Sequence, residues 1–458
     1  MDALKKTKIQ RIKCRVLKKI KPSASEEQKI DKLSKNLISM VNKMGYEAKI
    51  VGSIGKYTWL KGDHDIDLFI IFPNDMPRKQ LEKKGLELGK MLGKKLGSKP
   101  IIKYAEHPYT QIKYNMYDVD VVPCYKIDYG EKIISAVDRS PLHLSYVLKN
   151  LKPTLRDDVR LLKQFMKGIR TYGSDVKRLG YSGYVAELLV IHYGSFEAVI
   201  NAAANWKIPQ YVNCDKKKCK KKKTPGYLFL IDPVDSERNA AAAVSLDNLV
   251  KFIVFSKKFI DKPSSSVFFP KLQKLTARQT KKIKNRDTKF LVLVSKRPEI
   301  LNDTLFPQMR KVMRRFEKLF NEEDFIVLRS IEYADNKYMA IIFEFETYYM
   351  PKIKKIEGPP VFTRKHIKQF LTKYKRPKFG PFLQGKRLCV DVKRKYRKPE
   401  KLIKDFLSQS PDNLMLSGVP KNIVSAMKNA KIYNEKQFWK FVKRNKKLSD
   451  FIRLKYFE

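Results

Sequence analysis

Hydrophobic residues recur at helical spacing in the first part of the chain. Between residues 25 and 44 the apolar positions that share one face are Ile30, Leu33, Leu37, Ile38, Val41 and Met44. Ser25, with Gln28 three residues later, forms the pattern of a capping box, and Gly45 is of a residue type that commonly ends a helix. The pattern therefore predicts an amphipathic helix over residues 25–44.

Three β-rich segments follow this helix. The stretches YEAKIVGS (46–53), DIDLFIIF (65–72) and DVDVVP (118–123) carry residues typical of strands, and the last two are bounded by proline. Residues 78–97 between them have helical spacing. The first 125 residues or so are therefore predicted to run helix, strand, strand, helix, strand.

The middle of the chain has a helical pattern. Residues 156–205 are predicted to be helical apart from a break rich in glycine and tyrosine at residues 172–184. A further helix is predicted over residues 245–260. The sequence shows no internal repeat.

A different pattern begins near residue 289. A strand at 289–298, a helix at 308–323 and two strands within 325–346 form a β-α-β-β unit of the kind that often binds RNA, with a turn at Asp335-Asn336. Residues 362–407 are very basic with interleaved aromatic residues, and the last forty residues are predicted to be helical.

The length, composition and net charge of the chain indicate how many domains it has and what kind of partner it binds. At 458 residues, with 43% hydrophobic and 11% aromatic residues, the chain is too long for one ordinary core, and we expect three or four domains. The 98 Lys and Arg residues against 47 Asp and Glu residues give a formal charge of +51, which indicates a polyanionic partner. An anionic membrane surface is the alternative, but the basic residues are spread over the whole chain, which favours a large nucleic acid.

Several features bear on location and metal binding. No run of 18 apolar residues is present, and the basic N-terminal segment lacks the apolar core of a signal peptide, so it is predicted to be a surface helix. Five scattered cysteines favour reduced thiols and a cytoplasmic protein. Cys214 and Cys219 lie in a lysine-rich stretch without a second cysteine pair or a histidine pair, so a solvated loop is favoured over a zinc site.

Acidic residues cluster at the start of two predicted strands. Residues i and i+2 of a strand point to the same face, so Asp65 and Asp67 project together, and Asp118 and Asp120 repeat the pattern. One such pair alone is also typical of the solvated face of an edge strand. Here the apolar run after Asp67 is typical of a strand buried on both faces, so the acids mark its exposed start.

A glycine-serine pair precedes the first acidic pair. Gly52 allows close backbone approach, and the Ser53 hydroxyl with the amides that follow can receive phosphate oxygens. A third carboxylate from the second acidic strand would complete a two-metal site that activates an attacking hydroxyl and stabilises a leaving pyrophosphate.

These features occur within a longer ordered set of blocks. From about residue 50 to about residue 310 the blocks are GSIGKYTWLKGDHDIDLFIIFP, YAEHPY, DVDVVPCY, SAVDRSPLH, VRLLKQFMKGIRTYG, GYSGYVAELLV, DPVDSERNAAAAVSLDNL and LNDTLFPQ. The glycine-serine pair, the D-x-D pair and the distant strand carboxylate resemble the nucleotidyltransferase superfamily of the DNA polymerase β type. More narrowly, the ordered set resembles the archaeal-type class I CCA-adding enzymes. These are tRNA nucleotidyltransferases that build the 3′-terminal C-C-A without a nucleic-acid template.

The resemblance implies an α+β multidomain fold. It implies a polymerase-β-like catalytic head over residues 1–150, a mostly helical neck that recognises the nucleotide base over 151–265, a small α+β body over 266–365 and a basic α+β or helical tail over 366–458. The body and the tail would bind the acceptor stem and T arm of tRNA. Neither DNA nor a membrane is expected as a partner, and a homodimer is left open.

The same resemblance assigns roles to individual residues. Asp65, Asp67 and Asp120 would be the catalytic carboxylates and the ligands of two Mg²⁺ ions, with CTP and ATP as substrates. The nucleotide-binding positions would be Ser53 and Lys56 at the triphosphate, His143, Lys163 and Tyr172 at the nucleotide, and Arg238 at the base. Lys56 replaces the arginine that is usual in the family, which keeps the charge but loses the paired donors of a guanidinium.

Ordinary structural roles are open for several of these residues. Taken singly, His143, Lys163 and Tyr172 could be a polar helix residue, a solvated lysine and a packed tyrosine, whereas their order within the matched blocks favours function. His64 and His107 receive no role. A poly(A) or uridylyl transferase is the nearest rival enzyme. The rival of another class is an RNA-binding protein with an inactive transferase domain, against which the three intact acids argue.

Overall fold

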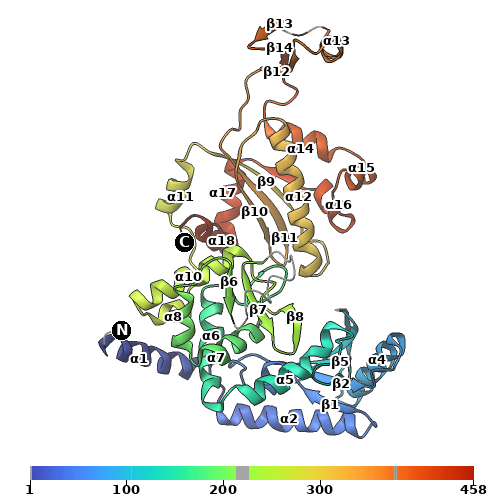
Figure 1. Ribbon diagram of the computed structural model, residues 1–458, viewed down its shortest axis with the longest axis vertical. Coiled ribbons are helices and arrows are strands. Elements are labelled where there is room, and N and C mark those ends of the chain that lie inside the picture. The colour runs from blue at the N-terminus through green and yellow to red at the C-terminus, as the bar shows by residue number, and fades with distance from the viewer. Residues whose placement is uncertain (1–2, 105, 213–225, 376, 378, 458) are drawn as a thin grey trace. The chain divides into compact units, whose positions relative to one another are not determined.

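A computed structural model describes residues 3–104, 106–212, 226–375, 377 and 379–457 (Figure 1). The chain forms two compact units, Met1–Pro270 and Lys271–Glu458, and each buries hydrophobic clusters of its own. The four-domain division stays a prediction, and its last boundary, after residue 365, falls inside α13 (Arg364–Lys373). The lysine-rich stretch with Cys214 and Cys219 lies outside the described residues.

The first sheet of the N-terminal unit carries the predicted acidic residues. Its order is β1-β2-β5-β4-β3, and only β2 and β5 run parallel. The bounds are β1 Glu47–Ile50, β2 Asp65–Phe72, β3 Ile101–Tyr104, β4 Pro108–Tyr114 and β5 Tyr117–Tyr125. The three predicted strands are confirmed as β1, β2 and β5, whereas β3 and β4 were not predicted. Pro123 lies inside β5 and not at its end, which is tolerated because β4 pairs with β5 only as far as Val121.

The helix α2 (Ala24–Asn42) packs its apolar stripe against this sheet. It begins at an earlier serine than predicted, because Ser23 is the N-cap. The Ser23 hydroxyl accepts the N–H of Glu26 at 3.2 Å, and the Glu26 carboxylate accepts the N–H of Ser23 at 2.7 Å. The predicted box of Ser25 and Gln28 is therefore wrong, since a carboxylate is a stronger acceptor than an amide.

Helices and a small sheet complete the N-terminal unit. The helices are α1 Ala3–Ile20, α3 Gly52–Gly55, α4 Arg78–Lys95, α5 Arg139–Asn150, α6 Arg156–Gly168, α7 Gly183–Tyr193, α8 Phe196–Ala203 and α10 Leu246–Asp261, with 3-10 turns η1 Ala136–Asp138, η2 Pro153–Leu155 and η3 Ser265–Val267. The small sheet contains β6 Gln210–Val212, β7 Leu228–Asp232 and β8 Asp235–Asn239 in that order. The predicted helical stretches and the break between α6 and α7 are confirmed.

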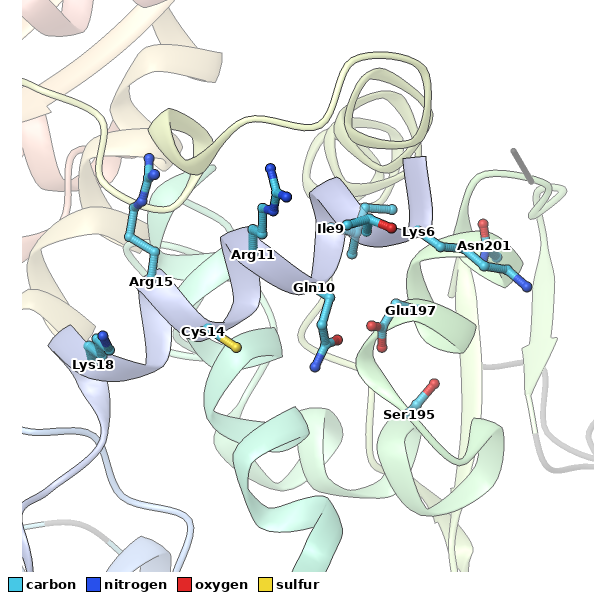
Figure 2. Close-up of a pocket in the computed structure, with 11 residues that line it drawn as sticks. Lys6, Ile9, Gln10, Arg11, Cys14, Arg15, Lys18, Ser195, Glu197 and Asn201 are labelled. Carbon is cyan, nitrogen blue, oxygen red and sulfur yellow. The ribbon is translucent and has the colours of Figure 1, made fainter. Parts of the chain in front are cut away.

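The basic helix α1 is more than a surface helix. Its buried residues, which lie on one stripe and join the core of the helical region, are Ile9, Ile12, Val16 and Ile20. Beside this stripe, α1 borders a groove of ≈ 990 Å³ with the start of α8, lined by Arg11, Cys14 and Ser195 among others (Figure 2). None of the predicted site residues lines this groove.

The C-terminal unit is built on a sheet of order β10-β11-β9-β15. Its strands are β9 Lys289–Lys296, β10 Val327–Ala334, β11 Tyr338–Phe345 and β15 Lys431–Tyr433, and its helices are α11 Ala277–Lys284, α12 Asn302–Glu322, α14 Pro399–Leu407, α15 Pro411–Leu416, α16 Lys421–Lys428, α17 Glu435–Arg444 and α18 Lys446–Phe457. The β-α-β-β unit and its turn at Asp335-Asn336 are confirmed. The helix α12 starts six residues before the predicted start at residue 308, because the buried side chains of Leu305 and Phe306 anchor an earlier turn.

A second, small sheet combines one strand that precedes the basic segment (residues 362–407) with two strands inside it. Its order is β12-β14-β13, with bounds β12 Ile353–Pro360, β13 Phe379–Gln384 and β14 Arg387–Lys393, and α13 contacts β12. The sequence predicted no strand in residues 362–407, where basic and aromatic residues alternate. None of the described helices in either unit combines the length and the apolar content that a membrane span requires.

Candidate active site

The two acidic strands lie side by side in the first sheet. Asp65 pairs with Asp118 and Asp67 pairs with Asp120 in the parallel register of β2 and β5. The alternate residues of β2, beginning with Ile66, are buried on the opposite face. Since neighbouring strands are about 4.8 Å apart, Asp67 and Asp120 project from one face as direct neighbours, with Asp65 two residues before Asp67.

The charge of Asp67 is poorly compensated. Burial of the side chain and the carboxylates of Asp120 and Asp65 raise its pKa to about 6, and the ammonium of Lys56 opposes this only in part. Burial also raises the pKa of Asp120, although Gln111 donates a hydrogen bond of 2.8 Å to its Oδ1. The cluster therefore favours a bound cation, which would remove the repulsion.

The chemistry of these acids suits a hard divalent metal ion. Carboxylate oxygens are the protein ligands that Mg²⁺ prefers, and the raised pKa of Asp67 shows that the surrounding side chains leave its negative charge incompletely balanced. Within the described part of the chain, no three metal-ligating side chains are gathered around one point. The acids therefore suit Mg²⁺ through their charge and their oxygen donors, not through a preformed coordination geometry.

The glycine-serine pair approaches the same acid. Gly52 begins α3 with a φ of +65°, and a Cβ at this position would overlap the Oδ2 atom of Asp67. The backbone N–H of Val51 donates to the carbonyl of Asp67 at 2.9 Å. The backbone thus comes as close as a glycine permits, and Ser53 follows in the first turn of α3.

A buried carboxylate links the two predicted lysines. Oε2 of Glu187 accepts a hydrogen bond from Lys56 Nζ at 2.9 Å, and its Oε1 accepts from Lys163 Nζ at 3.0 Å. Thr58 donates to Oε1 at 2.6 Å and accepts from Lys163 through its hydroxyl and its carbonyl. Burial opposes ionisation, but the two ammonium groups and the hydroxyl outweigh it and lower the pKa of Glu187 to about 2. These contacts occupy all three N–H donors of Lys163.

A second buried carboxylate joins His143 and Arg238. Oδ2 of Asp232, at the end of β7, lies 2.8 Å from His143 Nε2 and 2.7 Å from Arg238 Nη1. The hydroxyl of Tyr184 donates to Oδ1 at 3.0 Å. The rings of His143 and Tyr184 are stacked with centroids 3.8 Å apart, and Lys56 Nζ lies 4.8 Å from the centroid of the Tyr184 ring. The two buried clusters therefore adjoin.

Tyr172 lies close to the lysine cluster, whereas the two unassigned histidines do not join it. A Cβ added at Gly183 would lie 3.0 Å from the Tyr172 hydroxyl oxygen and 3.5 Å from Lys163 Nζ, so the two side chains lie beside the same point of the backbone. Burial raises the pKa of Tyr172 to about 12. His64 makes an edge contact with Tyr117, and Nδ1 of His107 lies 3.3 Å from a carboxylate oxygen of Glu82.

Sequence reasoning missed the carboxylates that hold this site together. Asp232 and Glu187 carried no prediction, and neither did Thr58 or Tyr184. A signal was present in the chain, because Glu187 is a single acid within the apolar stretch VAELLV of a predicted helix. An isolated acid in a buried stripe calls for a buried cationic partner.

Three family models match consecutive parts of the chain. A nucleotidyltransferase domain matches residues 30–143, the second domain of tRNA nucleotidyltransferase matches residues 157–269, and the C-terminal domain of CCA-adding enzyme matches residues 286–435. Together with the acidic strands, the first match defines the class of protein. The chain is a nucleotidyltransferase with a polymerase-β-like catalytic domain in a mixed α+β fold.

Similar proteins narrow this class to a family. A CCA-adding enzyme of Methanocaldococcus jannaschii is 37% identical over 426 residues, which cover 89% of this chain and 93% of the relative. A CCA-adding enzyme of Methanothermobacter thermautotrophicus is 37% identical over 409 residues, which cover 88% and 89% of the two chains. The chain belongs to the family of archaeal-type CCA-adding enzymes, as the sequence blocks predicted.

A solved structure is similar over part of the chain. The Cid1 poly(U) polymerase with Mg and 3′-dATP bound aligns with a TM-score of 0.44 and 14% sequence identity. The alignment covers 56% of this chain and 97% of the Cid1 chain.

Proposed function

We propose that this CCA-adding enzyme transfers CMP and AMP to the 3′ end of tRNA at the acids of β2 and β5. The single observation that carries the proposal is the placement of Asp67 directly beside Asp120, with the pKa of Asp67 raised to about 6. Asp65, Asp67 and Asp120 would hold two Mg²⁺ ions. When bound, these ions would activate the RNA 3′-hydroxyl and neutralise the leaving pyrophosphate.

The chain's own residues would bind the triphosphate. Ser53 follows Gly52, whose backbone adjoins Asp67, in the first turn of α3. Lys56 uses one described hydrogen bond, to Glu187, which leaves two N–H donors for phosphate oxygens. In the transfer, the 3′-oxygen of the RNA forms a bond to the α-phosphorus as the bond from this phosphorus to pyrophosphate breaks. Lys163 and Tyr172 would support the nucleotide from the adjoining cluster.

Base selection is proposed for Arg238, with His143 beside it. Cytosine and adenine both present a ring nitrogen that accepts a hydrogen bond, next to an amino group. Uracil and guanine present an N–H donor at the corresponding position, next to a carbonyl group. A guanidinium N–H that points at the ring nitrogen can donate to cytosine and adenine but meets an N–H donor in uracil and guanine, which suits the choice of CTP and ATP.

The tRNA would be held mainly through its backbone. The formal charge of +51 far exceeds what the reaction site needs, and the C-terminal unit carries the segment in which cations and aromatic residues alternate. We place the acceptor stem and T arm on basic surfaces of the protein, because double-stranded RNA is recognised by shape and phosphates more than by sequence.

The test is nucleotide addition to tRNA that ends at the discriminator base. We expect two additions with CTP alone, none with ATP, UTP or GTP alone, and three with CTP and ATP together. Long homopolymer tails from ATP or UTP would instead identify a poly(A) or uridylyl transferase. Binding of tRNA without any addition would identify an RNA-binding protein with an inactive domain.

A further inference from the structure

One carboxylate gathers side chains from three other elements of the N-terminal unit. Asp232 ends β7, and its partners are His143 from α5, Tyr184 from α7 and Arg238 from β8. The backbone N–H of Val234 donates a fourth hydrogen bond, at 3.2 Å to Oδ1. No exposed surface remains on the Asp232 side chain.

Burial of such a carboxylate is costly unless several groups hold it. The transfer of an ion from water into the interior costs several kcal/mol even after relaxation, and apolar packing at this position would avoid that cost. Burial opposes the charge here, but His143, the Val234 N–H and Arg238 outweigh it and lower the pKa of Asp232 to about 2. Asp232 is therefore a fixed anion at the centre of the residues proposed to contact the base.

Asp232 binds only one end of the Arg238 guanidinium. Asp232 contacts the Nη1 end of Arg238, and the arginine side chain is 35% exposed. The rest of the guanidinium is thus free to donate outward among the described residues. His143 is fixed more tightly, because it is stacked on Tyr184 while its Nε2 faces Asp232.

We propose that Asp232 is a positioning residue that sets the base selectivity of the enzyme by fixing the direction of the Arg238 donors. A free arginine side chain can rotate away from a base whose ring nitrogen carries a hydrogen, and can donate to water or to the neighbouring carbonyl group instead. A guanidinium fixed at one end cannot do so without loss of a charge-assisted hydrogen bond. UTP and GTP would therefore meet opposed donors, and the penalty would appear as selectivity.

The neighbouring residue Asp235 provides a matched control. Asp235 begins β8, and its Oδ2 accepts a hydrogen bond from Arg139 Nε at 2.9 Å. It therefore forms the same kind of partly buried arginine pair in the same turn, but it touches neither His143 nor Arg238 in the contacts described. Asp235→Asn changes charge and local stability without changing the contacts of Arg238.

The experiment measures kcat and KM for all four nucleotides on tRNA that ends at the discriminator base and on tRNA that ends in CC. We expect Asp232→Asn to lower the ratio of kcat/KM for CTP over UTP, and for ATP over GTP, by about 10-fold or more. Much of this change should come from higher KM for CTP and ATP. Asp235→Asn should leave both ratios within about 2-fold of the wild type, and the melting temperature of each variant is measured alongside.

A double-mutant cycle separates positioning from a general structural role. If Asp232 acts through Arg238, Asp232→Asn should change selectivity little further in an Arg238→Ala background. Equal loss of kcat/KM for all four nucleotides, or the same loss of selectivity in both backgrounds, would overturn the proposal.

The role inferred for Asp232 rests on the proposed function, but different results would contradict the two. Failure of the wild type to add C, C and A contradicts the function. In that case the selectivity of the wild type and of Asp232→Asn for whichever nucleotide is transferred still decides the role of Asp232.

Discussion

Gly52 and Asp67 are so close that a methyl group on Gly52 would occupy the position of the Asp67 Oδ2 atom. The two residues belong to successive elements, α3 and β2, which are joined by the hydrogen bond from Val51 N–H to the Asp67 carbonyl. A positive φ of +65° at Gly52 makes this approach possible. Only glycine therefore fits at position 52, because any larger side chain would collide with the Asp67 carboxylate.

Gly52→Ala should inactivate the enzyme without loss of tRNA binding. The new methyl group would displace the Asp67 carboxylate, so we expect kcat for CMP addition to fall about 100-fold or more, since a small misplacement of a catalytic group costs about this much. Gly62→Ala is the matched control, because Gly62 also has a positive φ, of +87°, but a Cβ there meets nothing within 4 Å. Similar activity losses in the two variants would attribute the effect to backbone strain.

Asp120→Asn should abolish metal-dependent addition. Removal of one acid lowers the negative charge that attracts the cations, so we expect weaker Mg²⁺ or Mn²⁺ binding by calorimetry and activity below about 1% of the wild type, as for loss of a metal ligand. Asp118→Asn on the same strand is the control and should retain most of the activity. Full metal affinity in Asp120→Asn would remove Asp120 from the proposed ligands.

Glu187→Gln should destabilise the N-terminal unit. The substitution removes the carboxylate that pairs with the buried ammonium groups of Lys56 and Lys163, and loss of one partner in a buried ion pair costs about 3–5 kcal/mol. Glu197→Gln is the comparison, because the pair of Glu197 with Lys13 is more exposed and should contribute about 1 kcal/mol or less. Denaturant unfolding at neutral pH measures both, and equal effects would contradict the role of Glu187.

The ionisation of Glu187 should also make the stability of the protein depend on pH. The pKa of Glu187 in the folded protein, about 2, lies below its ordinary value of 4.5. Its stabilisation is therefore complete above pH 4.5 and is lost as the pH falls from 4.5 towards 2. The stability of the wild type should fall more steeply than that of Glu187→Gln over this range, and parallel curves would show that Glu187 ionises normally.

Affinity for tRNA should depend steeply on salt. With a formal charge of +51, most of the binding free energy should come from neutralised phosphates, so affinity should fall by orders of magnitude between low and moderately high salt. Full tRNA and a minihelix of the acceptor and T arms should bind alike, and single-stranded RNA of equal length more weakly. Equal affinity for the single strand would indicate a general RNA-tailing enzyme.

Local patterns predicted the elements that carry the acids. The alternation in DIDLFIIF, with acids followed by a continuous apolar run, predicted β2 at its observed bounds, and the helices α4 and α10 followed from spacing alone. Short strands such as β15, with three residues, have too few positions to show a period. The capping error at Ser25 has a similar cause, because two overlapping S-x-x-E/Q patterns compete and only the contacts decide between them.

The sequence by itself determined the family, the acidic strands and the basic character of the protein, because these depend on residue type and on spacing within one segment. Only the tertiary structure decided which acids are neighbours, since the pairing of Asp67 with Asp120 depends on the parallel register of strands about 50 residues apart. The same holds for Glu187 and Asp232. Neither segment shows which groups its acid will meet, and the role of each acid arises because folding brings distant cations and rings to a carboxylate that water no longer reaches.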